Sequence, residues 1–143
     1  MDQRITLVTL GVDNLDRARA FYARLGWREA AASLPVLALF QLQGQALALF
    51  AREALARDQA RPAAELGTGA VTLAQNLASS EAVDAAWAEA LAAGATAIKA
   101  PERVFWGGYS GYWADPDGHV WEIAHNPFWP LAEDGTLTLP QPG

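Results

Sequence analysis

The carboxylate of Glu122 is the side chain of this sequence that is best placed to do chemistry. It lies in HVWEIAH, residues 119–125, directly after the tight-turn sequence DPDG. The alternation predicts a β-strand in which Val120, Glu122 and Ala124 share one face. A carboxylate among apolar side chains can bind a cationic or hydrogen-bond-donating group, or act as a general base with a raised pKa. It can equally be structural, hydrogen-bonded to a threonine or an arginine, and the sequence leaves these alternatives open.

An aromatic segment precedes this strand and supplies candidate contacts for an organic ligand. Residues 103–114, RVFWGGYSGYWA, predict a strand with a bend or bulge at the two glycines that follow Trp106. Core packing is the commoner role for any single aromatic side chain, because large rings contribute most when buried. We nevertheless expect at least one of Trp106, Tyr109 and Tyr112 to contact a ligand.

Other reactive residue types give little support to a different chemistry. The chain has no cysteine, which excludes disulfides, iron–sulfur clusters and thiolate zinc sites. Ser110 has no His or Lys at an activating spacing, and Asp115 and Asp117 belong to the predicted turn. His125 is three residues from Glu122 in a strand, so the two side chains should point to opposite faces and not share a metal ion.

The composition is that of a folded domain with a small-molecule partner. The chain has 143 residues, of which 52% are hydrophobic and 18% charged. A formal net charge of −6 disfavours nucleic acid and anionic membranes as partners. No stretch is long and apolar enough to span a bilayer, and the first residues do not resemble a signal peptide. We therefore expect a cytoplasmic protein.

The order β-α-β-β-β is predicted twice along the chain, which indicates an internal duplication. Each half has a strand, a helix that ends in an aromatic-x₃-Leu pattern before glycine, and then three strands. The first half has strands at 4–12, 28–31, 36–43 and 45–50, with the helix between Asn14 and Gly26. The second has strands at 70–76, 95–100, 103–114 and 119–125, with the helix between Ser79 and Gly94.

This repeat predicts one α+β domain over residues 1–143, because neither half can close a core alone. The first βαβββ module is expected at 3–50, a partly helical linker at 51–68, the second module at 69–126 and a tail at 127–143. Two four-stranded sheets with helices outside would pair to form a concave cup.

Two segments resemble the signatures of a known superfamily. Residues 106–123, WGGYSGYWADPDGHVWEI, resemble the second-module signature of the glyoxalase, bleomycin-resistance and extradiol-dioxygenase superfamily, also called vicinal oxygen chelate (VOC). Residues 10–22, LGVDNLDRARAFY, are similar to its first-module signature. With the repeat, the resemblance covers nearly residues 3–128. It implies tandem βαβββ modules whose sheets form a cup, and a homodimer, but it does not specify an activity, since one fold hosts many functions.

The resemblance also implies where a metal would bind. Members that hold a divalent metal use one His or Glu from each of four strands. These positions correspond to Leu7, Leu49, Ala70 and Glu122 in this chain. Leucine and alanine side chains have no lone pair to donate, and one carboxylate holds a divalent ion weakly. We therefore expect no metal cofactor.

Strand alternation predicts the lining of the cup. If Val8, Leu10 and Val12 pack on the first helix, then Leu7 and Thr9 look into the cup. The full set of expected ligand-binding residues is Leu7, Thr9, Leu47, Leu49, Ala70, Thr72, Trp106, Tyr109, Tyr112 and Glu122.

Three functions remain open from the sequence. The first is a metal-free protein that binds or sequesters an aromatic or cationic organic compound, as the drug-resistance members do. The second is an enzyme of the superfamily (a lyase, isomerase or dioxygenase) that depends on a metal or uses Glu122 as a general base. The third is a non-catalytic module that senses a ligand or serves in a stress-related operon.

Overall fold

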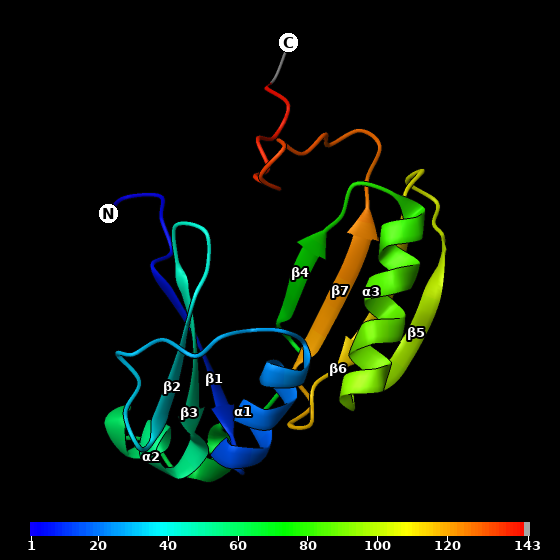
Figure 1. Cartoon of the computed structure of the whole chain (residues 1–143). Coiled ribbons are helices and arrows are strands. Elements are labelled where there is room, and N and C mark those ends of the chain that lie inside the picture. Colours follow the sequence, from blue (N-terminus) through cyan, green and yellow to red (C-terminus); the bar gives the residue numbers. More distant parts are fainter. Residues whose placement is uncertain (142–143) are drawn as a thin grey trace. The chain divides into compact units, whose positions relative to one another are not determined.

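The computed structural model describes residues 1–141, and the chain divides between Thr68 and Gly69 into two compact units. Each unit contains a mixed β-sheet with a helix along one face (Figure 1). The architecture is therefore α+β, as the sequence predicted. Within residues 1–141, no helix has the length and hydropathy needed to cross a membrane.

The first unit is a three-stranded sheet in the order β1-β3-β2, with β1 parallel and β2 antiparallel to β3. Its elements are β1 (Leu7–Val12), α1 (Leu15–Arg24), β2 (Leu37–Gln41), β3 (Ala46–Ala51), α2 (Arg52–Asp58) and the short 3₁₀ helix η1 (Ala63–Glu65). Helix α2 contacts β3 and β1, so the helical part of the segment that follows β3 packs on this unit.

Helix α1 begins where the sequence predicts it. The side chain of Asn14 accepts a hydrogen bond from the backbone N–H of Arg17 at 2.9 Å and so caps the first turn. Phe21 and Tyr22 are both 0% exposed, and the Tyr22 ring lies 5.9 Å from that of Phe40. Helix α1 therefore covers the face of the first sheet that carries Phe40.

The strand predicted at 28–31 is reduced to an isolated bridge between Glu29 and Phe40. A turn follows immediately, in which Ser33 N–H donates to the Ala30 carbonyl at 3.1 Å. Alanine has a low preference for strands, so nothing in this segment favours extending the pairing. The first sheet therefore has three strands where the sequence predicted four.

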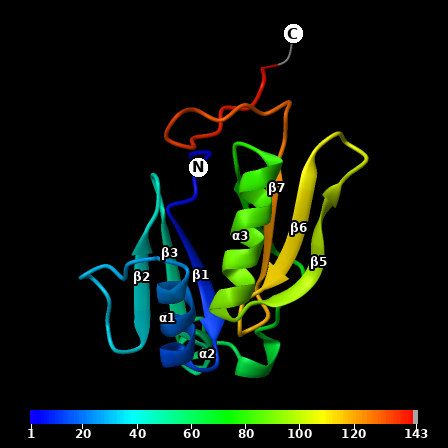
Figure 2. The same cartoon turned by 45° about the vertical axis from the view of Figure 1, so that its right-hand side comes forward.

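The second unit is a four-stranded sheet in the order β4-β7-β6-β5, in which β4 is parallel to β7 and the other pairs are antiparallel. Its elements are β4 (Thr72–Asn76), α3 (Ser80–Ala93), β5 (Thr96–Arg103), β6 (Tyr109–Ala114) and β7 (Val120–His125). Helix α3 lies along one face of this sheet and contacts β5, β6 and β7 (Figure 2). This is the βαβββ order that the sequence predicted.

The ends of α3 and the core beneath it follow from local sequence. Ser79 Oγ accepts from Ala82 N–H at 3.1 Å, and Gly94 ends the helix with a φ of 109°, a conformation that favours glycine. Trp113 and Trp121 stack with their ring centroids 5.5 Å apart, and both are at least nine-tenths buried. The predicted packing of Trp121 towards the helix is confirmed.

The stacked tryptophans give a direct test of this core. Replacing Trp113 with alanine should lower the free energy of unfolding by about 3–5 kcal/mol, because a buried ring is lost and a cavity remains. The matched control is Val120→Ala, on the opposite face of the same sheet and partly exposed, which should cost about 1 kcal/mol. Urea denaturation measures both, and equal losses would contradict the assignment of faces.

Candidate functional site

The register of the first sheet changes part of the predicted lining. Val8 pairs with Leu47 and Leu10 with Leu49, and paired residues lie side by side on the same face. Leu47 and Leu49 are 1% and 0% exposed, so they belong to the core beneath α1. The prediction that they share a face with Leu7 and Thr9 is wrong.

The error has a simple physical origin. Residues 46–51 read ALALFA, in which both alternating sets are apolar, so the sequence does not reveal which set meets the helix. The strand pairing places Ala46 beside Leu7 and Ala48 beside Thr9. Ala48, and not Leu49, is therefore the residue of this strand on the face of Leu7 and Thr9, and its side chain also has no donor atom.

Of the two residues predicted from the start of the second module, Ala70 and Thr72, only Thr72 lies in the sheet. Ala70 precedes β4 and is exposed, outside the paired strand. Thr72 is the first residue of β4 and pairs with Val120. The residue directly beside Glu122 on this strand is Ala74.

Glu122 lies at the centre of a face of the second sheet that α3 does not cover, which we call the Glu122 face. By strand pairing this face carries Thr72, Ala74, Asn76, Thr96, Lys99, Glu102, Ser110, Tyr112, Ala114, Val120, Glu122 and Ala124. Alanines therefore surround the carboxylate on several sides, and Thr72 is diagonal to it. The predicted sharing of one face by Val120, Glu122 and Ala124 is confirmed.

Tyr112 is the cross-strand partner of Glu122. Burial of the Tyr112 hydroxyl raises its pKa above the usual 10.0, and the negative charge of Glu122 and a hydrogen bond to that carboxylate raise it further. The hydroxyl therefore donates to Glu122 and stays protonated at neutral pH. The sequence anticipated a threonine or an arginine as the partner of this carboxylate, and the structure supplies a tyrosine from the neighbouring strand.

Lys99 and Glu102 complete the polar part of the Glu122 face, and neither was predicted. Lys99 pairs with Tyr112 and Glu102 with Ser110, and Lys99 Nζ lies 2.9 Å from Glu102 Oε1. They reach this face because β5 has two register shifts, between Ala97 and Lys99 and between Lys99 and Glu102. Pro101 inside the strand was the available signal, since proline in a strand marks an edge or a bulge.

Tyr109 lies on the opposite face from Tyr112. Its hydroxyl donates to Asp84 Oδ1 of α3 at 2.7 Å, and this hydrogen bond is the largest cause of its raised pKa. The prediction that Tyr109 lines the same surface as Glu122 is therefore wrong. The two glycines at 107 and 108 belong to the turn between β5 and β6, and the alternation of the strand begins only at Tyr109.

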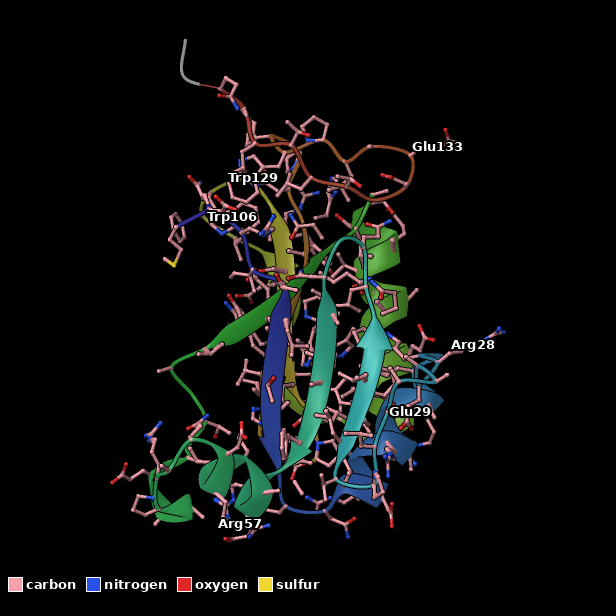
Figure 3. All side chains as sticks on the ribbon, turned by 90° about the vertical axis from the view of Figure 1, so that its left-hand side faces the viewer. Arg28, Glu29, Arg57, Trp106, Trp129 and Glu133 are labelled. Atoms are coloured by element: carbon pink, nitrogen blue, oxygen red, sulfur yellow. The ribbon has the colours of Figure 1, made fainter. Side chains whose placement is uncertain are left out.

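Trp106 also lies away from Glu122, in the turn between β5 and β6. Its ring packs on the backbone of Gly108, where an added Cβ would lie 1.7 Å from the ring. Gly107 beside it has a φ of 92°, and a Cβ added there would lie 2.9 Å from the ring of Phe128. Trp106 and Trp129 therefore mark the end of this sheet at which the tail begins (Figure 3). Of the three aromatic candidates, Tyr112 alone lies on the Glu122 face.

The side chains of His125 and Asp115 contact nearby backbone groups. His125 Nδ1 lies 3.0 Å from the Leu77 carbonyl, and strand alternation puts it on the other face from Glu122, as predicted. Asp115 Oδ1 accepts from the backbone N–H groups of Asp117 and His119, both at 2.9 Å, which closes the turn.

The donor atoms in the chain do not fit the metal centre that the VOC superfamily can build. Among the residues that the structure describes, no group of three or more His, Asp or Glu side chains could hold a metal ion. Glu122 has Ala74 on one neighbouring strand and Tyr112 on the other, and the remaining positions carry leucine or alanine. A divalent ion needs several fixed ligands, which these residues do not provide.

The chain belongs to the Glyoxalase/Bleomycin resistance protein/Dioxygenase superfamily, whose family model matches residues 4–123. The match includes both modules and Glu122. No curated protein matches the chain.

Solved structures of the superfamily share the fold. A glyoxalase-related enzyme from Fulvimarina pelagi is 32% identical with a TM-score of 0.87, over 96% of this chain and 98% of that one. A family enzyme from Burkholderia phytofirmans PsJN is 25% identical with a TM-score of 0.75, over 84% and 96%. A lactoylglutathione lyase from Agrobacterium tumefaciens is 26% identical with a TM-score of 0.70, over 90% and 98%.

The two tyrosine hydrogen bonds predict separate effects on tyrosine titration. Glu122→Gln should lower the pKa of Tyr112 towards 10.0 and leave Tyr109 unchanged, because only Tyr112 loses a neighbouring negative charge. Asp84→Asn should lower the pKa of Tyr109 and leave that of Tyr112 unchanged. Ring-labelled tyrosine followed by NMR against pH resolves the two, and a shift of both tyrosines in either variant would contradict the face assignment.

The same raised pKa fixes the sign of a stability change with pH. The pKa of Tyr112 is raised in the folded state. Its contribution to the free energy of unfolding is therefore fully present below its pKa in the unfolded chain, which is about 10. It is lost as the pH rises through the folded-state pKa. Urea denaturation between pH 9 and 11 should therefore show a smaller loss of stability in Glu122→Gln than in the wild type.

Proposed function

We propose that this protein binds an organic compound through a cationic or hydrogen-bond-donating group placed against Glu122, without a metal ion. The observation that carries the proposal is the Tyr112–Glu122 pair on a sheet face whose neighbouring side chains are small. A carboxylate has about four acceptor positions, and the Tyr112 hydroxyl occupies one of them. The others can accept from a ligand.

Two features of the surroundings favour a cationic or aromatic ligand. The ring of Tyr112 next to the carboxylate offers a face to a cation, an interaction that contributes about 0.5–2 kcal/mol. Ala74, directly beside Glu122, is exposed and presents a small apolar side chain to a ring, whereas Ala114 and Ala124 are buried. The net charge of −6 also attracts cations over anions at long range.

Catalysis by the same residues is the second candidate, and the pairing of a carboxylate with a protonated tyrosine is what favours it. Glu122 would accept a proton as a general base, and the Tyr112 hydroxyl would donate one. The similar structures from Fulvimarina pelagi and Agrobacterium tumefaciens carry the names of enzymes, which supports this alternative. The two functions differ in whether the bound compound is chemically changed.

Isothermal titration with matched probes tests the binding proposal. Benzylamine should bind more tightly than benzyl alcohol, because only the amine brings a positive charge to Glu122. Glu122→Gln should weaken benzylamine binding about tenfold, the loss expected for one charge-assisted hydrogen bond. The control is Glu133→Gln, which removes the same charge from the exposed tail (Figure 3) and should leave binding unchanged.

The outcome that contradicts the proposal is equal binding of the two probes, or equal effects of the two substitutions. Mass spectrometry of the same mixtures reports whether a probe is converted, and conversion that is lost in Glu122→Gln would favour the catalytic candidate.

A further inference from the structure

The two register shifts in β5 place the charged side chain of Lys99 on the Glu122 face. Regular pairing would place it on the opposite face. Thr96 pairs with Ala114 and Ala97 with Trp113, so an unbroken strand would place Lys99 opposite Gly111, on the α3 side. The first shift places it opposite Tyr112 instead. Bulges of this kind re-aim side chains and are frequent beside functional sites.

The second shift keeps Glu102 on the same face as Lys99. Residues three apart in a regular strand point to opposite sides, so they cannot form an ion pair. Lys99 Nζ and Glu102 Oε1 are nevertheless 2.9 Å apart, because one residue is inserted into the register between them. The pair holds the ammonium group over the Glu122 face.

The facing strand is built to accept this distortion. A Cβ atom on Gly111 would lie 2.8 Å from the backbone nitrogen of Pro101 and 2.9 Å from the carbonyl oxygen of Lys99. Glycine at 111 therefore gives the bulged strand the space that it needs, and Pro101 has no N–H to leave unpaired there. The sequence itself thus specifies the position of Lys99.

Lys99, Tyr112 and Glu122 form one row across β5, β6 and β7. Neighbouring strands are about 4.8 Å apart, so the two ends of the row are about 10 Å apart along the sheet. One end carries an ammonium group, the middle an aromatic ring and the other end a carboxylate. Lys99 is the only lysine of the chain, and its side chain is 47% exposed, with ammonium donors beyond the one that Glu102 accepts.

We infer that this row is a binding site for an amphoteric aromatic compound, with an acidic group at Lys99, a ring over Tyr112 and an amine at Glu122. The inference rests on the proposed function, because Glu122 receives the amine in both. It adds that Lys99 selects ligands that carry an anion at the end opposite the amine. The ligand class is therefore aromatic amino acids whose two charged groups lie at opposite ends of the ring.

Calorimetric titration of the full chain with para-(aminomethyl)benzoate and benzylamine tests the inference, since the two differ by one carboxylate. The wild type should bind para-(aminomethyl)benzoate roughly fivefold more tightly, the size expected for an exposed ion pair. Lys99→Met keeps most of the apolar stem and should reduce this ratio to about one. Arg103→Met, which removes a positive charge from the α3 side of the same strand, should leave the ratio unchanged.

Three results would overturn the inference, and they separate its failure from that of the proposed function. The first result is that Lys99→Met leaves the fivefold affinity ratio intact. The second is that the wild type binds para-(aminomethyl)benzoate and benzylamine equally well. In both cases Lys99 does not select for the carboxylate, and the role of Glu122 stands. If neither amine binds to the wild type, the proposed function fails and the inference fails with it. Circular dichroism and an unchanged thermal midpoint confirm that each variant is folded.

Discussion

A carboxylate that is partly withdrawn from water needs a hydrogen-bond donor, and this requirement organises the second sheet around Glu122. The donor is the hydroxyl of Tyr112, which antiparallel pairing brings to the adjacent strand position. One tyrosine stabilises the charge without consuming all of its acceptor positions. The arrangement therefore leaves a carboxylate that is held in place and still able to receive a ligand. The bulges that bring Lys99 and Glu102 to the same face extend this polar centre along the strand row.

The superfamily fold is present here, and we propose that it functions without the metal that some members hold. The resemblance places metal ligands at Leu7, Leu49 and Ala70 besides Glu122, and the side chains of these three have no lone pairs. In the second unit, the largest buried rings, Trp113 and Trp121, pack on the face opposite Glu122, so substitutions at Glu122 leave that part of the core in place. Separation of the stabilising and the binding face is what lets one fold carry different chemistries.

Sequence reasoning predicted the parts that depend on local chemistry. The Asn14 and Ser79 caps, the Asp115 turn and the position of Glu122 all follow from short-range rules and are confirmed. It failed where both alternating sets of a strand are apolar, as at Leu47 and Leu49, because the register then depends on the partner strand. It also missed Lys99, since a bulge reverses the face of the residues that follow, and a strict period of two cannot anticipate that.

We propose that Glu122, the one coordinating side chain at the positions where the resemblance places metal ligands, works with Tyr112 in place of a metal. Equilibrium dialysis of the full chain against Ni²⁺ or Zn²⁺, followed by elemental analysis of wild type and Glu122→Gln, tests it most directly. Far less than one ion per chain at micromolar metal, with no difference between the two proteins, is the predicted result. One tightly held ion per chain that disappears in Glu122→Gln would contradict the account.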